Sequence, residues 1–324
     1  MKAVNGNLVL LKPLCPPLLP RLLPQPNPKE FLPMQAPFAV IKGQTLPLNQ
    51  ALVPVNDRSF LFGDSLYEVV STYQGKPYFT RDHLQRLRAT AAGIYFDLPW
   101  EDAWFENEIR TGLNQMPGQE AYVRIVVSRG SGDFNIDIDT VETEPFCVTI
   151  FKPSLPMNPR FRAQGFSLAV PETRRNSPRS LNPAFKTGNY LNNILCLKEA
   201  KDQGADDALI LDLEGHITEL TTSNFFIVRQ GEIWTAPLDV GILDGITRRY
   251  LIQVARELGL TVHEKRFGLE EVLSADEAFV SSTLKGAMPV WKVNGQVIHE
   301  GYGEINRAVD DAYWQYVEAH LDSY

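Results

Sequence analysis

The sequence predicts an α+β fold, and two observations support this class. Short apolar or alternating segments, typical of strands, are interspersed with longer segments whose apolar residues recur at helical spacing. The chain has 324 residues, of which 44% are hydrophobic and 22% charged, so it is long enough to bury the cores of two packed domains. We therefore expect a smaller N-terminal domain and a larger C-terminal domain of mixed strands and helices.

The first 36 residues differ in composition from the rest. Residues 1–33 contain eight of the 23 prolines, and proline at this density prevents a regular helix. The apolar runs here are too short and too often broken by proline for a membrane span or a secretory signal. We expect residues 1–36 to form a disordered tail, with Met34 as an alternative start and a targeting segment as the other interpretation.

The predicted N-terminal domain covers residues 37–151. A strand and turn are expected at 39–46, further strands at 67–73, 77–79, 121–127 and 146–151, and helices at 81–94 and 101–115. A loop is expected at 57–64, a hairpin turn at Gln74-Gly75 and a glycine-bearing loop at 129–133. Three prolines within residues 152–159 predict an interdomain linker, which we place at residues 152–160.

The predicted C-terminal domain covers residues 161–324. Its strands are expected at 166–170, 208–213, 224–228, 232–234, 261–267 and 277–282, and a hairpin turn at Asn294-Gly295. Its helices are expected at 190–203, 247–258 and 304–320. In the first of these helices, the apolar residues Leu191, Ile194, Leu195 and Leu197 are expected to face the core.

Charge and cysteine content exclude several classes of protein. The net charge is -8, the pI is about 5.3 and no basic run is present, so a nucleic-acid backbone would be repelled. Cys15, Cys147 and Cys196 are odd in number and widely spaced, which offers neither a disulfide framework nor a metal site. We expect a protein of the cytoplasm, a reducing compartment, with no nucleic-acid, membrane or metal partner.

Lys186 is the candidate nucleophile. It lies between small and aromatic residues in the segment 183–191, just before a predicted helix. An apolar environment lowers the pKa of an ammonium group, which is the condition for a lysine to form a Schiff base. Taken alone, Lys186 can equally be a solvated loop residue.

Three further segments strengthen the case for Lys186. Glu219 lies between expected strands among hydroxyl and amide residues, and a carboxylate of this kind can keep a pyridine nitrogen protonated. Gly245-Ile246-Thr247 runs into a helix whose free N–H groups can bind a phosphate. Arg86 has the planar fork that suits a phosphate dianion. Separately, each has an ordinary alternative: a turn glutamate, a threonine cap and a surface arginine.

In this order and at these separations, the segments resemble the class IV pyridoxal-phosphate aminotransferases of fold type IV, the branched-chain and D-amino-acid aminotransferase family. The resemblance covers about residues 38–300. It rests on the following motifs: Phe62-Gly63-Asp64 with Tyr67-Glu68-Val69, His83-x-x-Arg86-Leu87, Lys186-x-x-Asn189-Tyr190-Leu191, Glu219 with Asn224, Gly245-Ile246-Thr247-Arg248, and Ser281-Ser282-Thr283 before Pro289-Val290.

The resemblance implies the cofactor and a role for each matching residue. Lys186 would form the Schiff base with pyridoxal 5'-phosphate and move the proton between substrate Cα and cofactor C4′. Glu219 would pair with the pyridine nitrogen, and Tyr190 with the phenolic oxygen. Arg86, Ile246, Thr247 and Thr283 would hold the phosphate, and Asn224 would complete the set of cofactor-binding residues. The likeness also implies amino-acid and 2-oxo-acid substrates exchanged in a ping-pong transamination, and a homodimer.

The substrate is less narrowly defined. Phe62-Gly63-Asp64 and Tyr67-Glu68-Val69 look more like the D-amino-acid members, but the Arg-x-His pair expected after Arg129-Gly130 in those enzymes is missing. Tyr122-Val123-Arg124 and the Ser282-Thr283-Leu284 turn look more like the branched-chain members, although a pocket arginine of that group is also missing. Predicted substrate-binding residues are Phe62, Tyr67, Tyr122, Arg124 and Leu284.

Four activities therefore stay open, in a definite order. A branched-chain-like L-amino-acid aminotransferase is favoured, and a D-amino-acid aminotransferase is the main alternative. Aminodeoxychorismate lyase, which shares the fold and lysine, is a further alternative, as is an amine transaminase. A non-catalytic scaffold is disfavoured because Lys186, Glu219 and Arg86 are all retained.

Overall fold

The computed structural model describes residues 36–322. The predicted tail and the alternative start at Met34 therefore lie outside the described residues, apart from Ala36. The described residues belong to one compact unit that contains two sheets. All strands of the first sheet precede residue 154 and all strands of the second follow residue 165. The division into two domains at the predicted linker stays a prediction.

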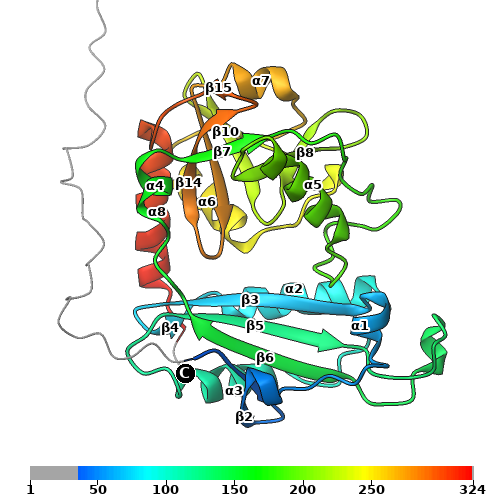
Figure 1. The fold of residues 1–324 in the computed structure, drawn as a ribbon. Helices are drawn as coiled ribbons and strands as arrows, with labels where there is room; N and C mark the ends of the chain where they lie inside the picture. The colour runs from blue at the N-terminus through cyan, green and yellow to red at the C-terminus, as the bar shows by residue number, and fades with distance from the viewer. Residues whose placement is uncertain (1–35, 323–324) are drawn as a thin grey trace, which may run out of the picture. The chain divides into compact units, whose positions relative to one another are not determined.

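The first sheet has six antiparallel strands in the order β2-β1-β6-β5-β3-β4 (Figure 1). Their bounds are β1 Phe38–Ile41, β2 Gln44–Pro47, β3 Ser65–Tyr73, β4 Lys76–Pro77, β5 Ala121–Ser128 and β6 Phe146–Pro153. Gln74 and Gly75, both at positive φ, form the predicted turn between β3 and β4. Helix α2, Thr80–Gly93, packs on β3, while α3, Asp102–Leu113, packs on β1 and β6. These helices bury the first core through residues such as Leu84, Leu87 and Ile109.

The second sheet has nine strands in the order β12-β11-β10-β13-β14-β7-β8-β9, with β15 paired to β14. Their bounds are β7 Phe166–Ala169, β8 Asp207–Leu211, β9 Ile217–Leu220, β10 Asn224–Arg229, β11 Glu232–Thr235, β12 Val262–Glu264, β13 Glu277–Ser282, β14 Gly286–Val293 and β15 Gln296–Val297. Asn224 of β10 also pairs with Glu219 of β9. This extra pairing joins the end of the sheet back to β10 and fixes Glu219 beside Asn224.

Three long helices cover the second sheet. Their bounds are α5 Leu191–Asp202, α6 Ile246–Glu257 and α8 Glu304–Ala319. Helices α6 and α8 pack on each other and on β13, and α8 also packs on β14. Beyond α8, Leu321 bridges to Tyr78, and the Asp322 N–H donates to the Pro77 carbonyl over 2.9 Å. The end of the described chain is thus tied to the first sheet.

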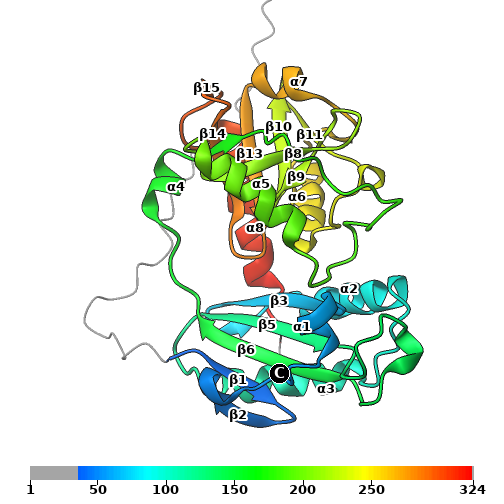
Figure 2. The same cartoon turned by 45° about the vertical axis from the view of Figure 1, so that its right-hand side comes forward.

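Helix α5 buries a different face from the predicted one. It packs against β8 (Figure 2), and its buried residues are Asn193, Cys196 and Ala200. Leu191, Ile194 and Leu195 are 68%, 58% and 48% exposed, and Leu197 is only partly buried. The prediction that these four face the core was wrong. The core under α5 is built from small residues, which allow the helix to approach the sheet closely and leave its bulky apolar side chains outside.

Some short elements were not predicted from the sequence. The loop expected at 57–64 contains helix α1, Arg58–Phe62, which Asp57 caps through the Ser59 N–H over 2.8 Å. Helices α4, Pro159–Ala163, and α7, Leu269–Leu273, were also missed, as were strand β9 and the longer strand β14. Three 3-10 turns lie at Leu48–Gln50, Ile138–Thr140 and Leu238–Val240. One-turn elements carry too few residues for a periodic signal.

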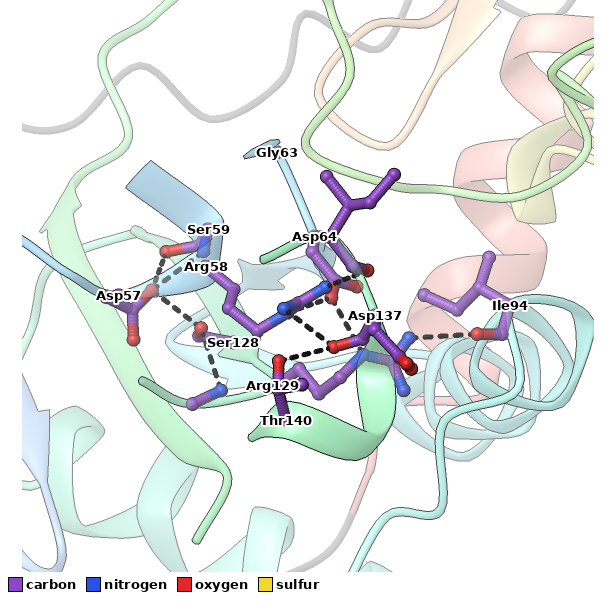
Figure 3. A network of polar contacts seen from close by, with 12 residues as sticks. Asp57, Arg58, Ser59, Gly63, Asp64, Ile94, Ser128, Arg129, Asp137 and Thr140 are labelled. Carbon is purple, nitrogen blue, oxygen red and sulfur yellow. Dashed lines mark hydrogen bonds and ion pairs between the residues drawn. The ribbon is translucent and has the colours of Figure 1, made fainter. Parts of the chain in front are cut away.

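A buried ion cluster fixes the loop between β5 and β6 (Figure 3). Arg58 and Arg129 each place Nε 2.8 Å from Oδ2 of Asp64. Arg58 also donates to the carbonyls of Asn135 and Ile136 over 2.8 Å. Although burial alone would raise the pKa of Asp64, the two arginines lower it overall. This charged cluster, which we call the Arg58 clamp (Arg58, Asp64 and Arg129), holds a loop that has almost no apolar core of its own.

Candidate active site

A cavity of about 460 Å³ is lined by residues from both sheets and from the loops that precede α5 and α6. Twelve of the thirteen predicted site residues line it. They are Tyr67, Arg86, Tyr122, Arg124, Lys186, Tyr190, Glu219, Asn224, Ile246, Thr247, Thr283 and Leu284. The structure therefore brings together residues that lie up to 217 positions apart in the sequence, from Tyr67 to Leu284.

Phe62 is the exception, since it does not belong to the cavity lining. It is the last residue of α1, and the Arg58 guanidinium lies over its ring at 5.2 Å from the centroid. Helix α1, which the sequence did not predict, turns this side chain toward the Arg58 clamp. A role for Phe62 in this chain's own cavity finds no support.

Two hydrogen bonds of the Lys186 main chain fix it to helix α2 and strand β3. Its N–H donates to Thr90 Oγ1 over 3.2 Å, and its carbonyl accepts from the Tyr67 N–H over 3.0 Å. Its ammonium lies 4.5 Å from the centroid of the Tyr67 ring. Burial, followed by the charge of Arg86, lowers the pKa of Lys186 to about 8. The lowered pKa makes the unprotonated amine easier to reach near neutral pH, as a Schiff-base lysine requires.

Glu219 lies in strand β9 rather than in a turn, and it is only 4% exposed. Arg175 donates to Oε1 over 2.6 Å, while the Asn224 side-chain amide and the Leu243 N–H donate to Oε2 over 3.1 and 3.2 Å. Burial raises the pKa of Glu219, and the positive charge of Arg175 opposes this rise. The Asn224 side chain thus helps to fix the Glu219 carboxylate. Its second amide N–H donates to the Leu243 carbonyl over 2.9 Å.

Arg86, on α2, is engaged mainly by a buried acid. Its Nε and Nη2 donate to the two carboxylate oxygens of Glu68 over 2.7 and 2.8 Å, and Nη1 donates to the Asp244 carbonyl over 2.9 Å. Burial alone would raise the pKa of Glu68, but Arg86 and His83 hold it well below its usual range. Nη2 also lies 3.5 Å from His83 Nδ1, whereas Nη1 keeps one N–H for a further partner.

The start of α6 faces the same cavity. Gly245, the N-cap residue, offers no side chain to cap the helix, and Gly245, Ile246 and Thr247 all line the cavity. A Cβ at Gly245 would lie 2.1 Å from Asn224 Oδ1, so only glycine fits there. The first N–H groups of a helix bind anions well, particularly with an arginine nearby. This end of the cavity suits a phosphate.

Tyr67, Tyr122, Arg124 and Tyr190 form the aromatic wall. In the antiparallel register of β3 and β5, Val69 is opposite Arg124 and Ser71 is opposite Tyr122, so residues 67, 69, 122 and 124 point to one face. The hydroxyl groups of Tyr67 and Tyr190 are hydrogen-bonded to each other. The Arg124 guanidinium lies over the Tyr67 ring at 4.1 Å from the centroid.

Several lining residues were not predicted. Arg175, Asn193 and Lys285 are the most informative, because each carries a polar side chain that contacts another part of the lining. Arg175 lies outside regular secondary structure, 44 residues before Glu219, so no local pattern marks it. Lys285 directly follows the Ser282-Thr283-Leu284 turn, and this position was the only available signal.

Comparisons with known proteins agree with this site. The profile of a family described as "Amino-transferase class IV" matches residues 65–293. A putative branched-chain-amino-acid aminotransferase of Methanocaldococcus jannaschii is 32% identical over 274 residues, covering 84% of this chain and 94% of that protein. A D-alanine aminotransferase of Listeria innocua is also 32% identical, over 271 residues, covering 81% of this chain and 89% of that protein.

Solved structures show the same fold. The Escherichia coli branched-chain amino acid aminotransferase superimposes with a TM-score of 0.81 at 25% identity, covering 89% of this chain and 97% of that one. The branched-chain aminotransferase of Thermoproteus uzoniensis gives a TM-score of 0.80 at 28% identity, covering 87% of this chain and 95% of that one. The protein therefore belongs to the class IV aminotransferases of fold type IV, and it is a pyridoxal-phosphate-dependent transaminase.

Proposed function

We propose that the protein exchanges the amino group between a branched-chain L-amino acid and a 2-oxo acid. The observation that carries the transaminase chemistry is the placement of Lys186, Glu219 and the uncapped start of α6 around one cavity. The branched-chain preference is supported by the similarity to the archaeal and E. coli proteins, which carry that name.

The residues of the cavity fit the cofactor. The Lys186 amine suits an aldehyde, the Glu219 carboxylate suits a pyridinium N–H, and the start of α6 with Arg86 suits a phosphate. Tyr190 is assigned to the phenolic oxygen. When bound, pyridoxal 5'-phosphate supplies the electron sink that weakens the substrate Cα–H bond.

The residues of the chain transfer the protons and orient the substrate. The Lys186 amine would take the proton from the substrate Cα and deliver it to C4′ of the cofactor, a role to which its lowered pKa is suited. Glu219, fixed by Arg175 and Asn224, holds the proton of the pyridine nitrogen. The Thr283 and Leu284 N–H groups receive the substrate carboxylate, and Tyr67, Tyr122 and Arg124 form the wall beside its side chain.

D-amino-acid transamination is the second candidate, favoured by the similarity to the Listeria protein. Against it, residues 131–136 contain neither arginine nor histidine, and Phe134 and Ile136 are 80% and 78% exposed in this loop. The loop thus presents apolar side chains where the D-specific members are expected to place their carboxylate trap.

The test is the visible spectrum of the purified holoenzyme during addition of single amino acids. We expect L-leucine and L-valine to remove the band of the bound cofactor, with D-alanine leaving it unchanged. A response to D-amino acids alone would establish the second candidate, and pyruvate release from aminodeoxychorismate would establish a lyase. The variant Lys186→Ala should lose the response altogether, and a full response in this variant would contradict the assigned chemistry.

We also propose that the protein is a homodimer of the cytoplasm. Apolar side chains are exposed on α5, where Leu191, Ile194 and Leu195 lie, and in the 131–138 loop, and exposed apolar groups of this kind mark interaction surfaces. Cys147 and Cys196 are buried free thiols, which fits a reducing compartment. Among residues 36–322, no helix is long and apolar enough to cross a membrane.

A further inference from the structure

Lys285 is a charged residue of the cavity that the cofactor assignments above do not use. Its side chain lines the cavity, and its ammonium donates to Ser223 Oγ over 2.7 Å. Within residues 36–322 it forms no ion pair with a carboxylate, and its other close neighbour is the Phe166 ring, 5.0 Å from Nζ to the centroid. An ammonium has three donors, so two stay unused.

The surroundings of Lys285 make this arrangement costly for the free protein. Burial lowers the pKa of Lys285, and Asp207 only partly opposes it. Asp207 forms no ion pair with Lys285, and its Oδ1 accepts instead from Thr221 Oγ1 over 2.6 Å and from the Ala208 N–H over 2.8 Å. Lys285 is itself partly exposed, but an ammonium largely removed from water without a carboxylate in direct contact is unfavourable. An anionic ligand in the cavity would remove this cost.

The turn formed by residues 282–285 indicates which anionic group Lys285 would bind. The Lys285 N–H donates to the Ser282 carbonyl over 2.9 Å and closes the 282–285 turn. Tyr78 Oη donates to the Thr283 carbonyl over 2.6 Å, and Asp310 Oδ1 accepts from the Ala287 N–H over 2.8 Å. The turn is thus fixed on both sides, with the N–H groups of Thr283 and Leu284 making no hydrogen bond within the described chain.

We propose that Lys285 is a substrate-binding residue whose ammonium pairs with the carboxylate received by the 282–284 turn. A phosphate is a less suitable partner, because the start of α6 and Arg86 already form a phosphate site. Lys285 makes this cavity selective for acids over uncharged compounds of the same shape. The proposal rests on the proposed function only in requiring an amino-acid substrate.

The test compares two probes of nearly equal shape, 4-methylvaleric acid and its neutral amide, by calorimetric titration of the holoenzyme. In Lys285→Met we expect the acid to bind about 10- to 100-fold more weakly, the change associated with one charged hydrogen bond. Binding of the amide should change less than about 2-fold. Lys285→Arg, which keeps the charge, should recover most of the affinity for the acid.

Controls separate the alternatives. Lys292→Met removes a lysine of β14 that does not line this cavity, and it should change neither probe. An equal loss for acid and amide in Lys285→Met would reduce Lys285 to a structural link between two turns and overturn the proposal. Weaker binding of pyridoxal 5'-phosphate in equilibrium dialysis, with the acid unaffected, would place the lysine on the phosphate and overturn it as well.

Failure of the branched-chain assignment is distinguishable from failure of this proposal. If the wild-type holoenzyme does not bind 4-methylvaleric acid, the proposed preference for branched-chain substrates is wrong. The same comparison is then made with propionate and propionamide, which match alanine. Selective loss of propionate binding in Lys285→Met would still support Lys285 as the carboxylate partner, and its retention would overturn it.

Discussion

At the scale of single residues, charge burial decides what the cavity can do. Lys186 and Glu219 lie in the same cavity, yet burial shifts the lysine pKa down and the glutamate pKa up, so both are moved toward neutrality. Arg175 opposes this shift for Glu219 by direct contact over 2.6 Å. Glu219, which we assign to the pyridine nitrogen, is therefore held next to the positive charge of Arg175.

Glu219→Gln should lower kcat on the order of 100-fold, because it removes the carboxylate that we assign to the pyridine nitrogen. Steady-state kinetics with L-leucine and 2-oxoglutarate would measure this. The conservative control is Thr218→Ser, a neighbour on β9 whose hydroxyl bonds the Ile210 carbonyl over 2.7 Å. A Glu219→Gln enzyme with wild-type kcat would remove the glutamate from the chemistry.

Asp310 gives a prediction about pH. Burial raises the pKa of Asp310 to about 6, although the Ala287 N–H, Arg162 and the Tyr302 hydroxyl oppose the rise. The folded state therefore holds this proton more tightly than the unfolded state, and the associated stability falls as pH rises from about 4 to above 6. Relative to Asp310→Asn, the wild type should lose about 2–3 kcal/mol of unfolding free energy between pH 4 and pH 8.

Urea denaturation of both proteins at several pH values would measure this difference. Asparagine can still accept from the Ala287 N–H, so the variant keeps the main contact. A difference between the two proteins that is constant with pH would show that Asp310 does not titrate in this range.

At the scale of elements, the Arg58 clamp determines the conformation of the 131–143 loop. Arg58→Met should cost about 2–3 kcal/mol of unfolding free energy, because Asp64 loses one of its two charged donors and three loop carbonyls lose theirs. Amide hydrogen exchange within residues 131–141 should accelerate. Arg58 is only 2% exposed, so little solvent is available to replace these bonds.

Arg88→Met is the matched control for the Arg58 clamp. Arg88 also pairs with an aspartate, Asp102, but the two side chains are 35% and 41% exposed. Its loss should therefore cost less than about 1 kcal/mol. Equal effects of the two substitutions, or unchanged exchange in the loop of Arg58→Met, would show that the clamp does not hold the loop.

At the scale of the whole molecule, the exposed face of α5 gives a prediction about assembly. Light scattering of the wild type should give twice the 36.5 kDa mass of the chain. Leu195→Glu, which places a charge among the exposed apolar residues of α5, should shift the protein toward the monomer. Ala103→Glu, which places the same charge at an exposed position of α3, is the control and should stay dimeric. A monomeric wild type would refute the dimer.

The sequence by itself predicted most of the longer elements and the candidate chemistry. Strand and helix periods, and glycine turns such as Gln74-Gly75, are local, so β3, α2, α6 and α8 were predicted within two residues at each end. Lys186, Glu219 and the start of α6 were found because short motifs carry them. Twelve of the thirteen predicted site residues then met in one cavity.

Only the tertiary structure decided which groups act on one another. The pairs Arg175–Glu219 and Lys285–Ser223 span 44 and 62 residues, and no local pattern encodes partners at such separations. The buried face of α5 was likewise set by the small residues of the strands beneath it rather than by the helix's own leucines. Packing density and the cost of burying charge, which act between distant segments, settled these points.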